Sequence, residues 1–596
     1  MSKVRILIID SGVRVDHPHL KNDGIQGLTW DGGEMDSGID DDFGHGTAVY
    51  GIIRSVNSFA EIINIRLKDI EEGIDYHALI ALLKYIYANI EADLINLSIG
   101  LADSECLQEL YHACQLLAEK GMIILSAFSN EGCISYPAAF DNVIGVCSDI
   151  RCWKNDMFYY IDDAKVNLCA KGGKQRVFWG QPDYIVSQGN SLACAHATVQ
   201  AAKFMHEGKK TLRDVLCMFK GISQKWYSLG SECMAEICQL TIKNVALFPF
   251  SKEMHSFLRY HKLLPFEIKA VYDVKYSAII GTTTQHCLKD NEVQNLIIKN
   301  IRDIEWEEID TLILGHMDEL SALINAENLR FMIIKKALEN GRQIFSFDDL
   351  SNYGFEKSKT MYFPTIDQRN VPLNRLGMLY RISKPVVGVF GTSPRQGKFT
   401  LQLKLREILM KQGYRVGQIG TEPSSLLFGF DYCYPMGYNS SVYIHDFDAV
   451  RYLNYIINDL CIKDCEIILV GSQSGTIPFD TGNIMQYTIP QQTFLMGTQP
   501  DCVVLCVNPF DDTEYVERTI RYIESSVETK VISIVVFPMD IQEGLYGSLG
   551  AKTKLDENKY EKIKAMYESK FNIPIFRLGE EAEMERLANR ITDYFS

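Results

Sequence analysis

The chain has 596 residues, of which 46% are apolar and 23% charged, a composition typical of folded globular domains and not of long disordered segments. Subtracting 76 Asp and Glu residues from 60 Lys and Arg residues gives a net charge of −16; with no basic block, this excludes nucleic acid and an anionic membrane as main partners. No apolar run approaches the ~18 residues of a membrane span. The N-terminus has no signal-peptide pattern, so we expect a cytoplasmic protein whose 16 cysteines are reduced thiols. No Cys-x-x-Cys pair is present, which argues against a zinc ribbon or a thioredoxin-type site.

At about 150 residues per domain, the length predicts about four domains, and three regions separate by pattern. In residues 1–205, buried-strand patterns at 4–10, 60–67, 92–100, 121–129 and 142–148 alternate with amphipathic helical patterns at 76–90 and 107–121. This alternation predicts a parallel sheet covered by helices on both faces. The helical stretch over 206–240 is predicted to be a connector.

The two later regions are also predicted to be α/β. Residues 241–360 carry strand patterns at 244–250, 268–273, 278–281, 311–315 and 343–347 and a helix at 329–341 that ends at Gly341. They are predicted to form a Rossmann-like domain, although no Gly-x-Gly-x-x-Gly loop is present. Residues 372–596 carry strand patterns at 385–390, 414–420, 465–471, 501–507 and 531–537, with helices between them.

Three segments of the first region suit nucleophilic catalysis. Asp10 ends the first strand pattern in IIDSGV, His45 opens a helix in DDFGHGTAVYGII, and Ser191 begins another in QGNSLACAHATVQAA. Alone, each has an ordinary structural explanation: a turn, a structural histidine and a helix N-cap. In an open parallel sheet, however, functional side chains gather at the carboxyl ends of strands, so we expect these three to meet there.

With their flanking residues, these segments make residues 1–205 resemble a subtilisin-like serine protease (peptidase S8), in which the triad has the same chain order. The resemblance implies that Ser191 is the nucleophile, that His45 is first its general base and then the general acid, and that Asp10 orients the imidazole. SAFSNEG resembles the family's AAGNEG, which assigns the oxyanion hole to Asn130 and the Ser191 N–H. NLSIG resembles its substrate-binding strand, formed here by Ser98, Ile99 and Gly100.

Three residues depart from the family motifs: Ala195 stands for a proline, Ser129 for a glycine and Asn190 for a threonine. They affect the wall of the specificity pocket and the local backbone rather than the triad. Proteolysis needs no cofactor, and no metal site is predicted. The acidic residues 40–42 either favour a basic residue near the cut or form a solvated loop, which is the favoured interpretation. Because the first strand begins near Met1, we expect no signal or pro-segment, and therefore narrow substrate choice or control by the other regions.

The third region contains a predicted phosphate loop. A strand at 385–390, the segment GTSPRQGKFT and a helix at 401–413 follow in the order typical of such loops. Gly391 and Gly397 would frame the loop, Lys398 would reach the outer phosphates, and Thr400 would bind Mg²⁺, so ATP or GTP with Mg²⁺ is the expected cofactor. Five residues instead of four separate the two glycines, and Phe399 replaces the usual Ser or Thr; the alternative is a chance match in a loop.

These departures resemble the GTDCxxGKxTT loop of the DUF1611 P-loop proteins, which are also described as D-glutamate N-acetyltransferase-like. Three further segments, 416–424, 468–475 and 494–508, resemble that family's ATGQTG, VEGQGS and GSQPDALVLCH segments. The Rossmann-like middle region matches the family's N-terminal half, so the resemblance covers about 241–560. The acid of VEGQGS is replaced by Gly471. Asp446 and Asp448, in HDFDAV, lie near that family's acidic ISDF segment, which makes them candidates to substitute for it. The resemblance therefore supports nucleotide binding more strongly than any transfer reaction.

A subtilase joined to such a module resembles fused proteins of clostridial peptide-maturation cassettes. This architecture implies an intracellular endopeptidase that removes the leader from a precursor peptide during maturation of a peptide natural product, with other maturation proteins as partners. Two alternatives remain open. In one, the P-loop module is the principal enzyme, an ATP-dependent ligase, kinase or acyltransferase acting on the peptide. In the other, the protein is a scaffold with a dormant triad.

Overall fold

The computed structural model describes residues 3–68, 76–102, 106–162, 167–228, 238–317, 320, 326–372, 378–437, 439–482, 487–541 and 552–596. The chain forms two compact units, one of Met1–Glu232 with Leu373–Ser383 and the other of Cys233–Pro372 with Lys384–Ser596. In the described part of the chain, no helix has the length and apolarity that a membrane crossing requires.

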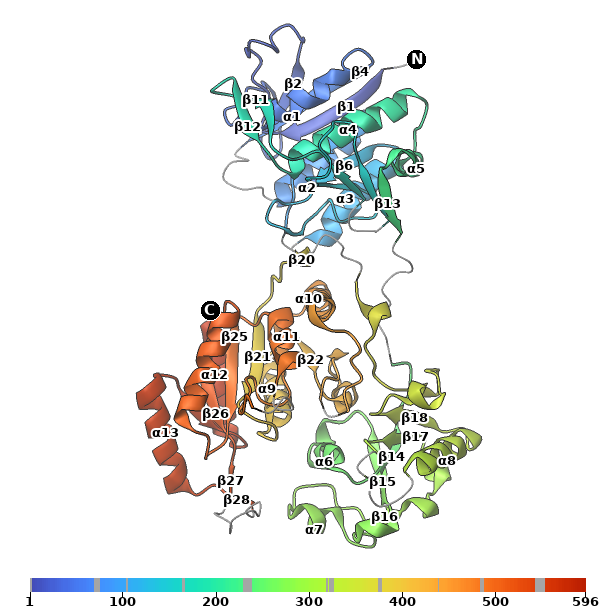
Figure 1. Ribbon diagram of the computed structural model, residues 1–596, viewed down its shortest axis with the longest axis vertical. Coiled ribbons are helices and arrows are strands. Elements are labelled where there is room, and N and C mark those ends of the chain that lie inside the picture. The colour runs from blue at the N-terminus through green and yellow to red at the C-terminus, as the bar shows by residue number, and fades with distance from the viewer. Residues whose placement is uncertain are drawn as a thin grey trace. The chain divides into compact units, whose positions relative to one another are not determined.

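The first unit is built on a ten-stranded sheet with the order β13-β9-β10-β8-β6-β5-β1-β4-β2-β3. Strands β1, β2, β4, β6 and β13 of this sheet are labelled in Figure 1. The strands are β1 (Val4–Asp10), β2 (Gln26–Trp30), β3 (Met35–Ser37), β4 (Ala60–Leu67), β5 (Leu94–Leu97), β6 (Ile123–Ala127), β8 (Ile144–Ser148), β9 (Tyr159–Asp162), β10 (Leu168–Ala170) and β13 (Lys225–Ser228). From β10 to β2 all neighbours pair in parallel. Helices connect successive parallel strands, as the alternation of strand and helix patterns predicts.

Helices cover both faces of this sheet because alternate strand residues point to opposite sides. In β1, Leu7 and Ile9 join the core under α2 (Tyr76–Asn89) and α3 (Leu107–Glu119). Ile6 and Ile8 join the core under α1 (His45–Ile53), α4 (Asn190–His206) and α5 (Leu212–Ile222). The predicted α/β class with a doubly covered parallel sheet is confirmed.

Much of the predicted connector over 206–240 lies inside the first unit. Helix α5 buries Val215 and Phe219, which are four residues apart and so share one helix face, in the core with α1 and α4. Strand β13 then pairs in parallel with β9 at one edge of the sheet. Residues 229–237 of the predicted connector lie outside the described residues.

The chain returns to the first unit after residue 372. Strand β20 (Leu379–Tyr380) pairs in parallel with β7 (Cys133–Ile134), with Leu379 opposite Cys133 and Tyr380 opposite Ile134. Met378, just before β20, is 8% exposed and belongs to the hydrophobic core that contains Ile134.

A hairpin of β11 (Gln175–Phe178) and β12 (Tyr184–Ser187) leads into α4.

The second unit holds two parallel sheets, ordered β16-β15-β14-β17-β18-β19 and β23-β22-β24-β21-β25-β26-β29. The strands of the first sheet are β14 (Asn244–Phe248), β15 (Glu267–Asp273), β16 (Ile298–Asn300), β17 (Thr311–Leu314), β18 (Gln343–Ser346) and β19 (Met361–Tyr362). The prediction of a strand at 278–281 is wrong, because Ala278 at φ 60° and Gly281 at φ 84° turn the chain. The helices of this part are α6 (His255–Arg259), α7 (Thr284–Leu288) and α8 (Ala326–Glu339), and α8 is followed by Gly341 at φ 66° as predicted.

The second sheet carries the phosphate loop. Its strands are β21 (Val386–Gly391), β22 (Val416–Gly420), β23 (Tyr432–Cys433), β24 (Ile467–Gly471), β25 (Cys502–Val507), β26 (Lys530–Val536) and β29 (Ile575–Arg577). Its helices are α9 (Lys398–Lys411), α10 (Asp446–Ile462), α11 (Ile489–Thr498), α12 (Thr513–Ser526), α13 (Glu557–Phe571) and α14 (Glu581–Tyr594), and a small hairpin joins β27 (Met539–Ile541) to β28 (Lys552–Lys554).

A shared hydrophobic core joins the two sheets of this unit. Phe257 of α6 stacks on Phe428, with ring centroids 5.2 Å apart, and Leu403 of α9 belongs to the same core. The predicted Rossmann-like and P-loop regions therefore face one another within one compact unit.

Candidate functional site

The three predicted triad residues come from elements that pack against one another. Asp10 ends β1, His45 begins α1, and Ser191 lies in the first turn of α4, while α1 contacts both β1 and α4. His45 Nδ1 lies 2.7 Å from Asp10 Oδ1, and Asp10 is only 2% exposed. A carboxylate accepts at this distance, so Nδ1 carries the proton and Nε2 is left for proton transfer.

Asp41 holds the turn that presents His45. Its carboxylate accepts hydrogen bonds from the N–H groups of Gly44 at 2.7 Å and Thr47 at 2.8 Å. It also accepts from the Ser11 hydroxyl at 2.9 Å, which ties the turn to the end of β1. Asp41 is buried, so the interpretation of residues 40–42 as a solvated loop is wrong for this member of the run.

The environment of His45 raises its pKa above the ordinary 6.5. Burial alone would lower this pKa, since it penalises the imidazolium. The negative charge of Asp10, its hydrogen bond and the charge of Asp41 together outweigh burial. The site therefore stabilises the imidazolium form of His45, in which both ring nitrogens carry a proton. This suits a general base, because the imidazolium forms when His45 takes the proton of the nucleophile.

Ser191 is placed by the start of α4. Gly189 is the N-cap at φ 151°, and Ser191 follows in the first turn, where backbone N–H groups have no partner within the helix. Its side chain is nearly buried, and no described residue forms a hydrogen bond with its hydroxyl. Catalytic hydrogen bonds are often long in structures without a bound substrate and tighten only in the substrate complex.

Asn130 is held in an orientation that leaves its amide N–H₂ group available. Its Oδ1 accepts the backbone N–H of Asn190 at 2.9 Å, so the donor end is the one left for an oxyanion. A Cβ at Gly189 would stand 3.3 Å from both Oδ1 and Nδ2 of Asn130. Glycine at 189 therefore suits both the left-handed backbone and the space that Asn130 needs.

Asn190, one of the three departures from the family motif, has a structural role that the sequence did not predict. Its Nδ2 donates to the carbonyls of Phe128 and Ser129, both at 3.0 Å, and its Oδ1 accepts the Ser148 N–H at 2.8 Å. The carboxamide thus fixes the two residues that precede Asn130.

The predicted substrate-binding residues follow β5. Ile99 is buried and its carbonyl accepts the Ser126 hydroxyl at 3.2 Å, so its side chain belongs to the core. Ser98 is half-buried, and a Cβ at Gly100 would stand 2.5 Å from the backbone nitrogen of Ser129. The segment 98–100 therefore runs directly beside the one that carries Asn130.

The predicted phosphate loop joins β21 to α9. Gly391 ends β21, and Gly397 caps α9 with φ 74°. Lys398 Nζ donates to the carbonyls of Ser393 and Ser474, both at 2.8 Å, and the side chain is almost completely buried. Burial lowers the pKa of Lys398 to about 8.

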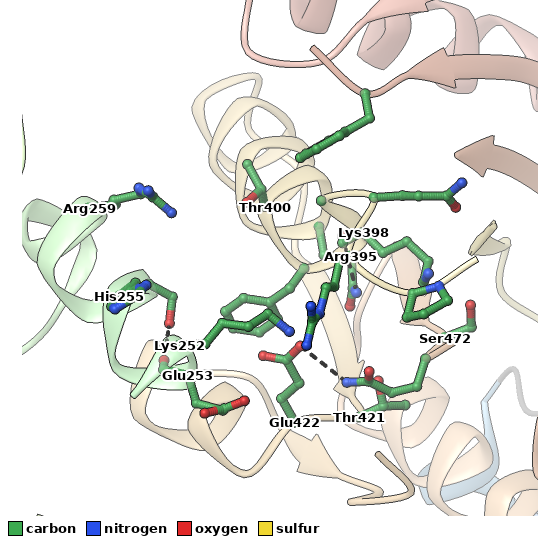
Figure 2. Close-up of a pocket in the computed structure, with 18 of the residues that line it drawn as sticks. Lys252, Glu253, His255, Arg259, Arg395, Lys398, Thr400, Thr421, Glu422 and Ser472 are labelled. Carbon is green, nitrogen blue, oxygen red and sulfur yellow. Dashed lines mark hydrogen bonds between the residues drawn. The ribbon is translucent and has the colours of Figure 1, made fainter. Parts of the chain in front are cut away.

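A cavity of about 410 Å³ lies against this loop (Figure 2). Lys398 and Thr400 line it from the loop and the first turn of α9, while Lys252 and Arg259 come from the other sheet's side of the unit. Arg395 completes a set of four cations. This charge suits a polyphosphate ligand, because phosphates are bound by ammonium and guanidinium groups.

The acid in this cavity is not the one that the sequence suggested. Neither Asp446 nor Asp448 is among the described lining residues, so the expectation that they substitute at this site is wrong. Glu422, directly after β22, lines the cavity instead and accepts Gln473 Nε2 at 3.2 Å. Burial raises the pKa of Glu422.

Gly471, which stands where the family has an acid, has no room for a side chain. A Cβ at Gly471 would stand 1.9 Å from Nε2 of Gln402, a buried residue of α9. The side chain of Gln402 therefore occupies the space of an acid at 471. Ser472 Oγ and Gln402 Oε1 are buried beside the cavity without a partner among the described residues, which fits a polar ligand there.

Comparison with known proteins yields two families. The model of the subtilase family matches residues 1–216, and that of the DUF1611 P-loop domain, a domain of unknown function, matches residues 376–587. The major intracellular serine protease of Bacillus subtilis (strain 168) is 30% identical over 165 residues, 24% of this chain and 50% of that protein. Thermitase of Thermoactinomyces vulgaris is 27% identical over 223 residues, 35% of this chain and 77% of that protein.

One solved structure, of a DUF1611 family protein from Anabaena variabilis, is 14% identical with a TM-score of 0.43, covering 59% of this chain and 99% of that chain. The chain spans half the length of the Bacillus protease. The first unit thus combines the Asp10–His45 pair with a subtilase match, and the second combines the Lys398 loop with a DUF1611 match. Residues 1–216 are accordingly similar to the subtilase family, and residues 376–587 to the DUF1611 P-loop domain family.

Proposed function

We propose that the first unit is a serine endopeptidase. The observation that carries this proposal is the hydrogen bond of 2.7 Å between His45 Nδ1 and the buried carboxylate of Asp10, with Ser191 at the start of a helix packed on both elements. This arrangement leaves one imidazole nitrogen for the serine proton. A purely structural histidine would not need an adjacent nucleophile and oxyanion donors.

The reaction follows from these positions. His45 Nε2 takes the proton of the Ser191 hydroxyl as its oxygen attacks the scissile carbonyl, and Asp10 stabilises the imidazolium that forms. Asn130 Nδ2 and the Ser191 N–H bind the oxyanion, an interaction worth roughly 3 kcal/mol for the asparagine. His45 then gives its proton to the leaving amine, and water repeats the sequence to release the acyl group.

We further propose that the substrate is a precursor peptide whose leader is removed. The support is the union of a subtilase domain with a DUF1611 P-loop domain in one chain, the architecture that resembles peptide-maturation proteins.

For the second unit we propose binding of ATP or GTP with Mg²⁺. Lys398 would exchange its two carbonyl partners for phosphate oxygens, and Arg395, Lys252 and Arg259 would neutralise the remaining charge. Thr400 would contribute its hydroxyl to the cation. A bound nucleoside triphosphate supplies a transferable phosphoryl group. The raised pKa of Glu422 equips this carboxyl to take a proton from the group that receives the phosphoryl.

One experiment tests the protease. Purified protein is treated with a fluorophosphonate probe and mapped by mass spectrometry, with Ser191→Ala compared to Ser58→Ala at an exposed serine. We expect label on Ser191, and loss of label and of peptide cleavage only in Ser191→Ala. A wild-type protein without label would support the scaffold alternative.

A second experiment tests the nucleotide site. Calorimetry with ATP or GTP and Mg²⁺ should show binding that Lys398→Ala weakens and Lys411→Ala, an exposed lysine at the end of the same helix, does not. The absence of binding at millimolar nucleotide would refute this assignment. Nucleotide turnover by Ser191→Ala protein would show that the second unit has an activity of its own.

A further inference from the structure

A cleft of about 820 Å³ opens beside the proposed oxyanion hole in the first unit. Asn130, Gly189 and Asn190 line it, and these are the oxyanion donor and the two residues before the nucleophile. A substrate side chain near the scissile bond would therefore enter this cleft.

One wall of the cleft is made by a residue from beyond the protease sequence. Met378 lines it, although the subtilase family match ends at residue 216 and the P-loop family match begins at 376. Its position is fixed twice: its side chain packs in the core of the first unit, and the next two residues pair with β7, which closely follows Asn130 in sequence.

The chemistry of the lining favours an uncharged side chain. Met378, Cys147 and Ile150 are the apolar residues of the lining, and apart from Lys174 the other lining residues are glycine, serine or amide residues. Among the described lining residues the charged one is Lys174, and none is an acid. A basic substrate side chain would thus meet a like charge and no carboxylate, while an apolar side chain would find a matching wall.

We propose that Met378 is a specificity-determining residue of the protease, which limits the size of an apolar substrate side chain flanking the scissile bond. The inference rests on the proposed function. The first residue of β21, the strand that leads into the phosphate loop, follows Met378 by eight residues. The same short segment therefore supplies a wall of the cleft and leads into the P-loop domain.

The test measures kcat/KM of the full chain on a peptide library that varies the residues on either side of the cut. Met378→Ala should shift the ratio of aromatic to small apolar substrates at least about tenfold towards the aromatic ones, since a methylene-sized change in a pocket alters discrimination by roughly 10–200-fold. Leu379→Ala is the matched control: its neighbouring side chain is half-buried and does not line the cleft. It should leave the ratio unchanged.

Fluorophosphonate labelling of Ser191 counts the folded active sites in each variant. If Met378→Ala does not fold, Met378→Val removes less volume, suits an extended segment, and should give a smaller shift in the same direction. Labelled Met378 variants with the substrate ratio of Leu379→Ala would overturn the inference while leaving the proposed protease intact. Absence of label in the wild type would instead remove the proposed function itself.

Discussion

Replacing Asn190 by alanine should both destabilise the first unit and impair its oxyanion hole. The substitution removes three hydrogen bonds of this buried side chain, two to the carbonyls of Phe128 and Ser129 and one from the N–H of Ser148. At about 1 kcal/mol for each bond, the loss is roughly 3 kcal/mol of unfolding free energy. The backbone N–H that holds Asn130 Oδ1 survives in the variant, so the amide should be loosened rather than lost.

The catalytic effect has an upper bound. Removing the Asn130 amide altogether should lower kcat by about 10²–10³-fold. Because Asn190 acts through the position of Asn130, Asn190→Ala should lower kcat by less than this, with little change in KM. Asn190→Asp separates the accepting from the donating hydrogen bonds of this side chain. Its carboxylate still accepts the Ser148 N–H but cannot donate to the two carbonyls.

The assay follows the first unit by itself. Fluorophosphonate labelling of Ser191 at increasing urea reports unfolding of the protease, independently of the second unit. We expect Asn190→Ala to lose labelling at lower urea, and Asn130→Ala to lower kcat without a comparable change in the urea midpoint. An Asn190→Ala protein with wild-type midpoint and wild-type kcat would refute this explanation of the motif's departure.

Three further predictions concern charge and packing. Asp10→Asn removes the main charge that raises the pKa of His45, so the acid limb of a pH–rate profile should move to lower pH while kcat falls about 10⁴-fold. Lys398 has a pKa of about 8 and must be charged to hold phosphate, so nucleotide affinity measured by calorimetry should fall about tenfold per pH unit above pH 8 and level off below it. Gly471→Ala should lower the urea midpoint of the second unit by forcing Gln402 to move, and adding Gln402→Ala should restore part of the loss; equal midpoints would contradict the clash.

The sequence predicted the parts of the first unit that local pattern controls. Strand periodicity placed β1 and helix periodicity placed α2 and α3, while the motif segments placed Asp10 at the end of a strand and His45 and Ser191 at the starts of helices. The role of Asn190 was not predictable, because its partners Phe128 and Ser148 lie 62 and 42 residues away in sequence. Substitution of an amide for a hydroxyl is visible in the sequence, whereas the two carbonyls that it satisfies are visible only in the fold.

The same limit applies to the second unit. The glycines and Lys398 of the phosphate loop follow one another in sequence, so their arrangement could be predicted. Lys252 and Arg259 reach the cavity because Phe257 packs on Phe428, a contact between segments 171 residues apart that no periodicity indicates. Asp446 and Asp448 were suggested by nearness in sequence to a family motif, and the start of α10 places them elsewhere.

The return of the chain to β7 also sets a time order during synthesis. The two parts of the first unit are separated by the 140 residues from 233 to 372. A ribosome adding roughly 5–20 residues per second needs about 7–28 s to pass them. Throughout that interval the proposed catalytic residues Ser191, His45 and Asp10 have already been translated, whereas Met378 has not. A nascent chain therefore contains the three proposed catalytic residues before it contains Met378, the residue proposed to limit the substrate side chain.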